Sequence, residues 1–579
     1  MKNIRKVELN AELQDGLEID VAIVGAGVSG LYTGYRLVTD NDRSGSKMPA
    51  GRVQIFEMGN RIGGRLESVE LPGMHIRGEL GGMRYMESQR MVSTLIEQVF
   101  EDRLTSIDFP MGDDAHLFKY LRKQRLEADE WVKSQNRGEK LVTRYFLNER
   151  DVGFNADQLF NRIVYDVMMT DPWFVGSPFA AKVKRIDEYN FEFQFSNEDW
   201  DQIKPALSYC FEGPYKGKKV NSIGFWNLIK DQVSEEGFNF LSDAGGYNSN
   251  TINWNAAEAF VNMVGDFSNA GTEYKTIQGG YDGIAYALAS AYMSHPGACI
   301  WTENQLIRFN RSSREGYRYE LVFLNLPSQA EWKVYANSIV LALPRRSLEL
   351  LDQFNFFFNP ETQTDLQDNI KSVIAESSFK ILMGFEHPWW EAFGAKSGHS
   401  ITDLPLRQCY YFGVDPRTSH SLLLGSYNDI STVTFWKVLC DHPHKFSAKS
   451  TSLVPAESMR HLAFSQASQM MVDEIIHELR ELHGPAIVVP APYVTWFKDW
   501  SKDPFGGGYH AWKAGYSIED VMVFMRKPDV AEQIHICGEA YSGQQGWVEG
   551  AICVAEKMLQ EHFAMPWPGW LEKDYYLGW

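Results

Sequence analysis

Three glycines near the N-terminus form the pattern Gly25-x-Gly27-x-x-Gly30, and a carboxylate, Glu57, stands 27 residues after the last of them. In such a pattern the first glycine makes a tight turn and the second lets the backbone approach a pyrophosphate. The third lets a helix pack close to a sheet. A carboxylate at the end of the following strand binds a ribose hydroxyl. These residue types therefore predict a site for a dinucleotide.

The glycines need a strand before them and a helix after them. Residues 19–24 are an apolar run typical of a buried parallel strand, and a helix is predicted to follow through Leu37. The first N–H groups of that helix would face the phosphates. A polar loop over residues 39–51 accounts for the long spacing to Glu57, which follows a second predicted strand over residues 53–56.

Two distant segments have the pattern of further strands in the same sheet. Residues 338–343 form an apolar run closed by a proline, and residues 533–537 form another short apolar run. After the second, apolar residues recur at helical spacing from Val548 to Leu559. We therefore expect the two ends of the chain to share one sheet. Residues 94–266 are rich in helix formers and aromatics, which predicts a largely helical middle.

The composition limits the class of partner. The chain of 579 residues carries a formal net charge of −19, and this mean field repels phosphate, which speaks against nucleic acid and acidic membranes as partners. Its six cysteines form no CxxC pair, its N-terminus lacks an apolar signal core, and no stretch reaches the ~18 apolar residues of a membrane helix. We expect a cytoplasmic protein of two or three domains.

The segment after Glu57 is more specific than the glycines alone. Five residues separate Glu57 from Gly63-Gly64-Arg65, and this extension resembles the FAD-binding start of the flavin amine oxidase superfamily. Four later stretches resemble further FAD-binding segments of that superfamily: Glu79–Arg84, Ile277–Asp282, Val340–Pro344, and Cys537–Ala540 with Gly546–Ala551. Five matched segments in the same order make coincidence a poor explanation.

This resemblance implies FAD as the cofactor and no metal. The residues implied to hold FAD are Gly25, Gly27, Val28, Ser29, Gly30, Glu57, Met58, Gly64, Arg65, Gly82, Met83, Arg84, Gly538, Glu539, Gly546, Trp547 and Val548. Glu539 would bond the ribityl chain, and the helix after Gly546 would point its N-terminus at the isoalloxazine ring. Covalently flavinylated relatives carry a cysteine in the stretch that matches Pro504–Tyr509. Because no cysteine stands there, we expect FAD to be held non-covalently.

Arg84 helps to choose among the branches of the superfamily, because the substrates of amine oxidases have no carboxylate to bind. It resembles the arginine with which L-amino acid oxidases hold the substrate carboxylate, and a guanidinium fork suits that task. Residues 400–411 resemble another stretch of these oxidases and include Tyr410. Tyr427 resembles the tyrosine that bonds the same carboxylate, and Trp547 would wall the substrate site.

Lys380 and Asp243 are two further candidates. Lys380 lies in an otherwise apolar strand, where an unpartnered lysine is costly, and it resembles the superfamily lysine that holds a water near flavin N5. That lysine serves the reaction with oxygen or hydrolysis. Asp243 precedes Ala-Gly-Gly in a stretch similar to bacterial lysine and tryptophan 2-monooxygenases and related oxidases. It is a candidate to meet a cationic substrate side chain, or else a plain turn residue.

The sequence thus predicts an FAD-dependent L-amino acid oxidase. Arg84, Tyr427, Trp547 and Lys380 would be catalytic, and Tyr410 and Asp243 would help to bind substrate. Oxidative deamination with oxygen would yield a 2-oxo acid, ammonia and hydrogen peroxide. The acidic balance favours a basic substrate such as L-arginine or L-lysine, with a broad range as the next choice. The alternatives are an L-amino acid 2-monooxygenase, which yields an amide, and an amine or polyamine oxidase. We also expect a homodimer or larger homo-oligomer.

The expected fold class is α/β, with three domains. Residues 18–87, 268–350 and 525–565 would form a discontinuous Rossmann-like FAD-binding domain, residues 88–110 and 351–524 a mixed-sheet substrate-binding domain, and residues 111–267 a helical domain.

Overall fold

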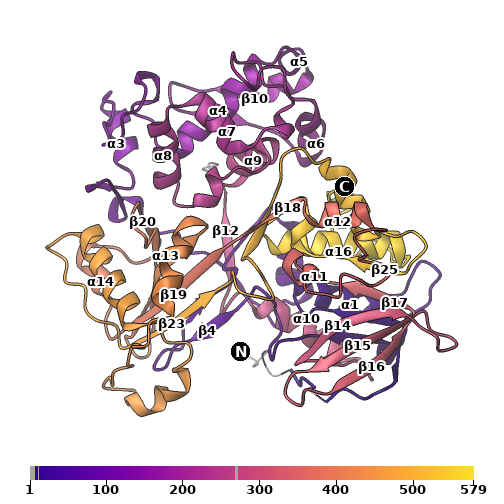
Figure 1. Cartoon of the computed structure of the whole chain (residues 1–579). Coiled ribbons are helices and arrows are strands. Elements are labelled where there is room, and N and C mark those ends of the chain that lie inside the picture. Colours follow the sequence, from indigo (N-terminus) through magenta and orange to yellow (C-terminus); the bar gives the residue numbers. More distant parts are fainter. Residues whose placement is uncertain (1–4, 6, 11, 268–271) are drawn as a thin grey trace.

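The computed structural model describes residues 5, 7–10, 12–267 and 272–579. It contains a five-stranded parallel sheet in the order β13-β3-β2-β17-β25. These strands span Ile300–Trp301, Val53–Phe56, Val21–Val24, Ser338–Leu341 and Ile534–Ile536. Strands from both ends of the chain therefore lie side by side, which confirms the prediction of a shared sheet (Figure 1). Residues 268–271, where the predicted FAD-binding domain resumes, lie outside the described residues.

Alternate residues of β2 enter two different cores. Val21 and Ile23 pack with three helices, whereas Ala22 and Val24 pack with a second sheet on the opposite face. The helices are α1 (Val28–Thr39), α10 (Gly283–Met293) and α16 (Val548–His562). The second sheet has the order β1-β16-β15-β14, with bounds Leu17–Glu18, Glu331–Ala336, Tyr319–Asn325 and Asn304–Arg311. The apolar run over residues 19–24 is thus explained by burial on both faces.

A seven-stranded mixed sheet has the order β23-β19-β22-β21-β20-β8-β9. Its strands span Val494–Asp499, Ser378–Phe385, Ser421–Asp429, Gln408–Val414, His399–Thr402, Phe118–Leu121 and Gln124–Glu127. Helices α13 (Ser431–Cys440) and α14 (Gln469–His483) share one hydrophobic core with it (Figure 1). Every residue of β19 is buried, so its apolar character follows from its central place.

Strands β8 and β9 correct one expectation, since they come from the segment predicted to be a helical domain. β8 pairs in parallel with β20, although residues 118–127 carry several charges and no strict alternation. The pairing partner, rather than the local pattern, determines these strands. The predicted boundary between residues 110 and 111 therefore does not follow the edge of this sheet, and the division into three domains as such stays a prediction.

Most of residues 130–262 form helices that lie above both sheets in the view of Figure 1. They are α3 (Glu130–Asn136), α4 (Ala156–Thr170), α5 (Pro172–Val175), α6 (Asn197–Ala206), α7 (Phe225–Gln232), α8 (Glu235–Ala244) and α9 (Ala256–Asn262). Asn155 starts α4 with a capping box closed by Gln158. Within the described ranges, no helix combines the length and the apolar character needed to cross a membrane.

Three small sheets carry residues that matter for the site. They are β4-β5 (Ser68–Glu70 and Arg77–Glu79), β6-β12-β7 (Tyr85–Met86, Tyr274–Ile277 and Ser106–Asp108) and β18-β24 (Val373–Glu376 and Tyr509–Trp512). The segment between β5 and β6 ends at Arg84, so the strands on either side fix its position.

Candidate active site

A cavity of about 950 Å³ lies where the two large sheets and the helical segment meet. Its size is at the upper end of the range of ligand pockets, about 300–1,000 Å³, which is far more than a free amino acid needs. Eighteen of the residues predicted for the site contribute to its wall: Gly25, Gly27, Val28, Ser29, Glu57, Met58, Gly64, Arg65, Gly82, Met83, Arg84, Lys380, Tyr427, Gly538, Glu539, Gly546, Trp547 and Val548. Their individual roles stay predictions.

The three glycines at one end of the cavity have different surroundings. A side chain at Gly25 would approach the carbonyl oxygen of Ala342 to 2.5 Å, and its φ of +105° favours glycine. A side chain at Gly30 would lie 2.0 Å from the carbonyl oxygen of Gly25, so this glycine lets α1 pack closely. A β-carbon on Gly27 would meet no atom of the described residues within 4 Å apart from its chain neighbours, and this open side faces the cavity.

Glu57 is half-buried at the end of β3 and also lines the cavity. Its carboxylate accepts hydrogen bonds from Ala26 N at 2.9 Å and from Gly59 N at 2.8 Å. Burial raises the pKa of Glu57, and the two backbone N–H groups oppose this rise. The carboxylate thereby holds the glycine turn in place while facing the space where a ribose would lie.

Glu57→Ala is expected to weaken FAD retention by about 10- to 100-fold, because a buried charge-assisted hydrogen bond contributes about 1.5–3 kcal/mol. The dissociation constant of FAD, measured by fluorescence after dialysis, checks this prediction. An unchanged constant would show that Glu57 does not anchor the cofactor.

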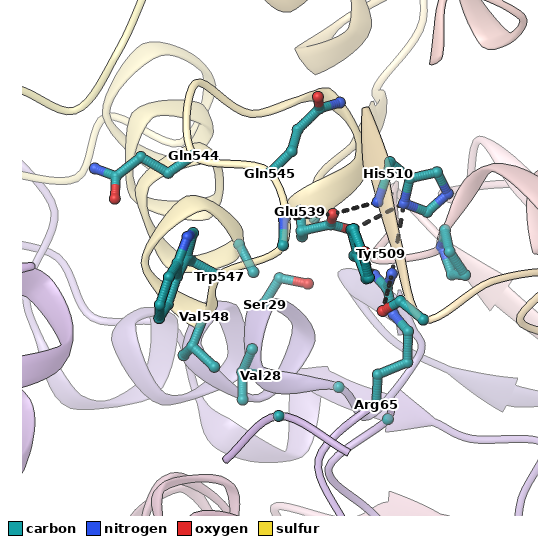
Figure 2. Close-up of a pocket in the computed structure, with 18 of the residues that line it drawn as sticks. Val28, Ser29, Arg65, Tyr509, His510, Glu539, Gln544, Gln545, Trp547 and Val548 are labelled. Carbon is teal, nitrogen blue, oxygen red and sulfur yellow. Dashed lines mark hydrogen bonds and ion pairs between the residues drawn. The ribbon is translucent and has the colours of Figure 1, made fainter. Parts of the chain in front are cut away.

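Glu539 joins three segments at the other side of the cavity (Figure 2). Its carboxylate pairs with Arg65 at 2.8 Å and accepts hydrogen bonds from His510 N and Gly546 N, each at 2.8 Å. Burial opposes the charge, yet Arg65 and His510 lower the pKa of Glu539 to about 2. Glu539 therefore stays ionised and fixes the turn before α16 as well as lining the cavity.

Two helices begin at the cavity. Gly27 is the N-cap of α1 and Trp547 is the N-cap of α16, and neither helix receives a side-chain cap. Their first residues, Val28 and Val548, lie close to each other in Figure 2. Uncapped N–H groups and positive dipole ends suit an anionic ligand. Together with the open side of Gly27 and the carboxylate of Glu57, they fit a flavin dinucleotide.

Lys380 is buried on β19 and points at the segment between β5 and β6. Its Nζ donates a hydrogen bond to Gly81 O at 2.6 Å and lies 4.3 Å from the ring centroid of Tyr427. Burial lowers the pKa of Lys380 to about 7, against the attraction of Glu79 and with the repulsion of Arg84. This amine can therefore gain or lose a proton near neutral pH.

Aromatic rings orient Arg84. Its guanidinium carbon lies 4.0 Å from the ring centroid of Tyr274 and 5.4 Å from that of Phe109. Arg84 is only partly buried, lines the cavity, and is close enough to influence the pKa values of Lys380 and Tyr427. A cation thus stands near Lys380 and Tyr427, two of the three other residues predicted to be catalytic.

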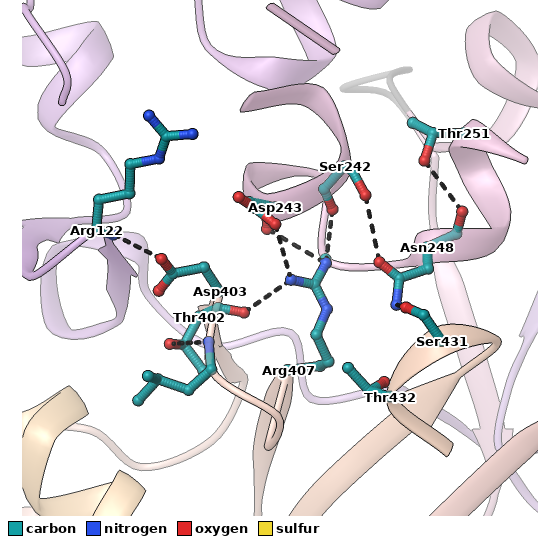
Figure 3. Close-up of polar contacts among 12 residues, drawn as sticks. Arg122, Ser242, Asp243, Asn248, Thr251, Thr402, Asp403, Arg407, Ser431 and Thr432 are labelled. Carbon is teal, nitrogen blue, oxygen red and sulfur yellow. Dashed lines mark hydrogen bonds and ion pairs between the residues drawn. The ribbon is translucent and has the colours of Figure 1, made fainter. Parts of the chain in front are cut away.

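Two predicted substrate residues do not line the cavity. Tyr410 lies behind Tyr247, with 3.1 Å between the hydroxyl oxygens, so it supports the wall and does not form it. Asp243 accepts a hydrogen bond from Tyr145 at 2.8 Å and pairs with buried Arg407 at 3.5 Å, as Figure 3 shows for the arginine. These partners occupy its carboxylate, and the assignment of Asp243 to a substrate side chain is corrected on this ground.

Several cavity residues were absent from the predicted set. Tyr509 and Tyr247 belong to the wall, and the Tyr509 hydroxyl donates to Ser249 Oγ at 2.6 Å. Glu376 also lines the cavity from the end of β18. Tyr509 ends the stretch that carries the flavin-linking cysteine in covalently flavinylated relatives, so its position offered a signal. Tyr247 directly follows the Asp243-Ala-Gly-Gly stretch, whereas nothing in the local sequence marks Glu376.

The chain matches the family described as flavin containing amine oxidoreductase over residues 28–555. Aplysianin-A of Aplysia kurodai is 24% identical over 571 residues, covering 94% of this chain and 90% of that protein. An L-amino-acid oxidase of Mus musculus is 24% identical over 546 residues, covering 92% of this chain and 69% of that protein.

Among solved structures, a putrescine oxidase bound to putrescine is similar over 95% of this chain and 100% of its own, with a TM-score of 0.59 and 15% identity. At this identity the likeness is one of fold.

Proposed function

Because this chain belongs to the flavin-containing amine oxidoreductases and is an FAD-dependent oxidoreductase, we propose that it oxidises the α-carbon of a free L-amino acid. The family match confirms the resemblance found in the sequence, and the mixed α/β architecture agrees with it. The proposal of an amino acid substrate draws further support from relatives named L-amino-acid oxidase, at 24% and 22% identity.

The observation that carries the proposal is the position of Arg84. It lines the cavity near Lys380 and Tyr427, and its guanidinium, which stacks on the ring of Tyr274, presents the fork of N–H donors that suits a carboxylate. A simple amine has no carboxylate for Arg84 to bind, and the guanidinium repels the amine when the amine is protonated. The geometry therefore favours an α-amino acid over an amine or polyamine.

In the proposed mechanism Arg84 and Tyr427 hold the substrate carboxylate, and Trp547 and Tyr509 exclude water from the reacting carbon. The α-amine must be neutral, so that its lone pair assists as the hydride leaves. When bound, FAD supplies an acceptor for two electrons and returns them to oxygen as hydrogen peroxide. Lys380 holds a proton, and so a positive charge, next to Gly81 O. The released imine hydrolyses to a 2-oxo acid and ammonia.

A basic side chain, as in L-arginine or L-lysine, is the favoured substrate within this proposal. Asp243 no longer supports that preference, but the carboxylates of Glu198 and Asp574 line the cavity. Together with the net charge of −19 they attract cations to the site.

A panel of the twenty L-amino acids, read as peroxide release with analysis of the organic product, tests the proposal. Release of a 2-oxo acid, ammonia and peroxide supports it. An amide and CO₂ without peroxide would assign the chain to the 2-monooxygenases instead, and no turnover of any L-amino acid would reject the proposal.

We expect FAD to be released intact by acid or heat, because none of the six cysteines lines the cavity within the described residues. Precipitation with trichloroacetic acid followed by absorbance of the supernatant checks this. Flavin that remains on the denatured protein would contradict non-covalent binding. A cytoplasmic location and a homo-oligomeric state stay predictions, the second to be measured by light scattering.

A further inference from the structure

Glu376 is a buried carboxyl group that has no hydrogen-bond partner in the part of the chain that the structure describes. It ends β18, lines the cavity, and is 0% exposed. Among the carboxyl groups of the described residues, it alone has both oxygens buried without a hydrogen bond. Burying a polar group without a hydrogen bond destabilises the fold, and burying a charge does so more strongly. Such a group calls for a partner that arrives from outside the chain.

The charges around Glu376 do not supply that partner. Burial raises the pKa of Glu376 well above its ordinary range, and the carboxylates of Asp429 and Glu539 raise it further. Among the described residues, no ion pair joins Glu376 to a cation. Asp429 and Glu539 themselves are satisfied, because Asn248 N and Ser249 N donate to Asp429, and Arg65 and His510 bind Glu539.

Glu376 and Arg84 line the same cavity, together with Tyr427 and Tyr509. Glu376 is the strand partner of Tyr509 across β18 and β24. Burial raises the pKa of Tyr427, and the charge of Arg84 opposes this rise. The cavity wall therefore carries both a cation, Arg84, and a carboxyl group without a hydrogen bond, Glu376.

This polarity matches a substrate with a carboxylate at one end and a cation at the other. The α-amine is a poor partner for Glu376, because a carboxylate beside it would keep it protonated, whereas the reaction needs it neutral. A side-chain ammonium or guanidinium has no such conflict and would satisfy both orphaned oxygens.

We propose that Glu376 is a specificity-determining residue that binds the side-chain cation of a basic L-amino acid whose carboxylate is held at Arg84. This inference rests on the proposed amino acid oxidation and adds to it the group that selects the side chain.

Glu376→Gln tests the inference with matched substrate pairs, because glutamine keeps the shape and removes the charge. L-Arginine is compared with its neutral isostere L-citrulline, and L-lysine with L-norleucine. In the variant, kcat/KM for the basic member of each pair is expected to fall about 10²-fold, mostly through KM, and that for the neutral member to change less than about 3-fold. Discrimination is the ratio of kcat/KM for the basic member of a pair to kcat/KM for the neutral member. Glu376→Asp is expected to keep at least about a tenth of the wild-type ratio.

Glu315→Gln is the matched control, since it removes one negative charge from an exposed position outside the cavity wall. It is expected to leave the discrimination within each pair unchanged. FAD content and melting temperature are measured for every variant. Equal losses for basic and neutral substrates, no loss at all, or loss of FAD from Glu376→Gln would each overturn the inference.

Different results would contradict the proposed function and the role of Glu376. If the wild-type enzyme oxidises neutral and basic amino acids alike, and Glu376→Gln changes neither, the inference alone is wrong. If the wild-type enzyme oxidises no L-amino acid, the proposed function fails and this inference fails with it.

Discussion

Arg84→Ala is expected to raise the apparent Kd for L-amino acids by about 10²-fold or more. The substitution removes a charge-assisted fork from a carboxylate that is partly withdrawn from water, and 10²-fold corresponds to about 2.7 kcal/mol. The reductive half-reaction should slow as well, because a substrate held at one end only is misaligned. Anaerobic stopped-flow measurement of flavin bleaching against substrate concentration gives both quantities.

The expected loss belongs to the substrate and not to the cofactor, so the FAD content of Arg84→Ala should match that of the wild type. Arg84→Lys, which keeps the charge without the fork, should lie between the two. Decarboxylated analogues such as agmatine and cadaverine should gain relative to their amino acids in Arg84→Ala. Loss of FAD from this variant would place Arg84 in the cofactor site and remove the main support for the substrate.

Lys380→Met is expected to slow the reaction of the reduced enzyme with oxygen by about 10-fold or more, and reduction by substrate much less. A cation next to the reacting atoms stabilises negative charge that develops only in the oxidative half-reaction. Because burial lowers the pKa of Lys380 to about 7, the ammonium predominates below that pH and is lost above it. The oxygen rate constant of the wild type should therefore fall as pH rises through about 7.

Methionine carries no charge at any pH, so Lys380→Met should lose this step in the pH profile. Lys498→Met is a suitable control, because Lys498 faces Lys380 in the strand register but pairs with Glu67 at 2.8 Å outside the cavity wall. Double-mixing stopped flow separates the two half-reactions. Equal slowing of both by Lys380→Met would indicate that Lys380 serves the substrate or the fold.

The glycine turn of the cofactor half could be predicted because its residues follow one another in sequence. Gly25, Gly27 and Gly30 act through turn geometry and close packing, which are local properties of strand, turn and helix. Strand β3 has the predicted bounds, and α16 begins at the predicted Val548. Strand β2 is buried on both faces, and this is why a continuous apolar run predicted it correctly as a buried strand.

The substrate half could be predicted only in part, because distant strands assemble it. Glu376 reaches the cavity through the pairing of β18 with β24, and nothing near it in sequence shows that its carboxyl lacks a partner. From the sequence, Asp243 was a candidate to bind a cationic substrate side chain. In the fold its carboxylate instead forms an ion pair with Arg407. These contacts depend on strand register and on packing between segments that are far apart in the sequence. The pattern of residue types within one segment does not reveal them.

Anaerobic flavin bleaching by matched substrates tests the central claim most directly. The wild-type enzyme is mixed with L-arginine and, separately, with agmatine, which is the same molecule without its carboxylate; L-leucine and isoamylamine form the neutral pair. We predict rapid bleaching by at least one of the two amino acids. The rate with the corresponding decarboxylated amine should be at least about 10²-fold lower, because Arg84 binds the carboxylate that the amine lacks. Amines that bleach the flavin as fast as their amino acids would contradict the account and assign the enzyme to the amine oxidases.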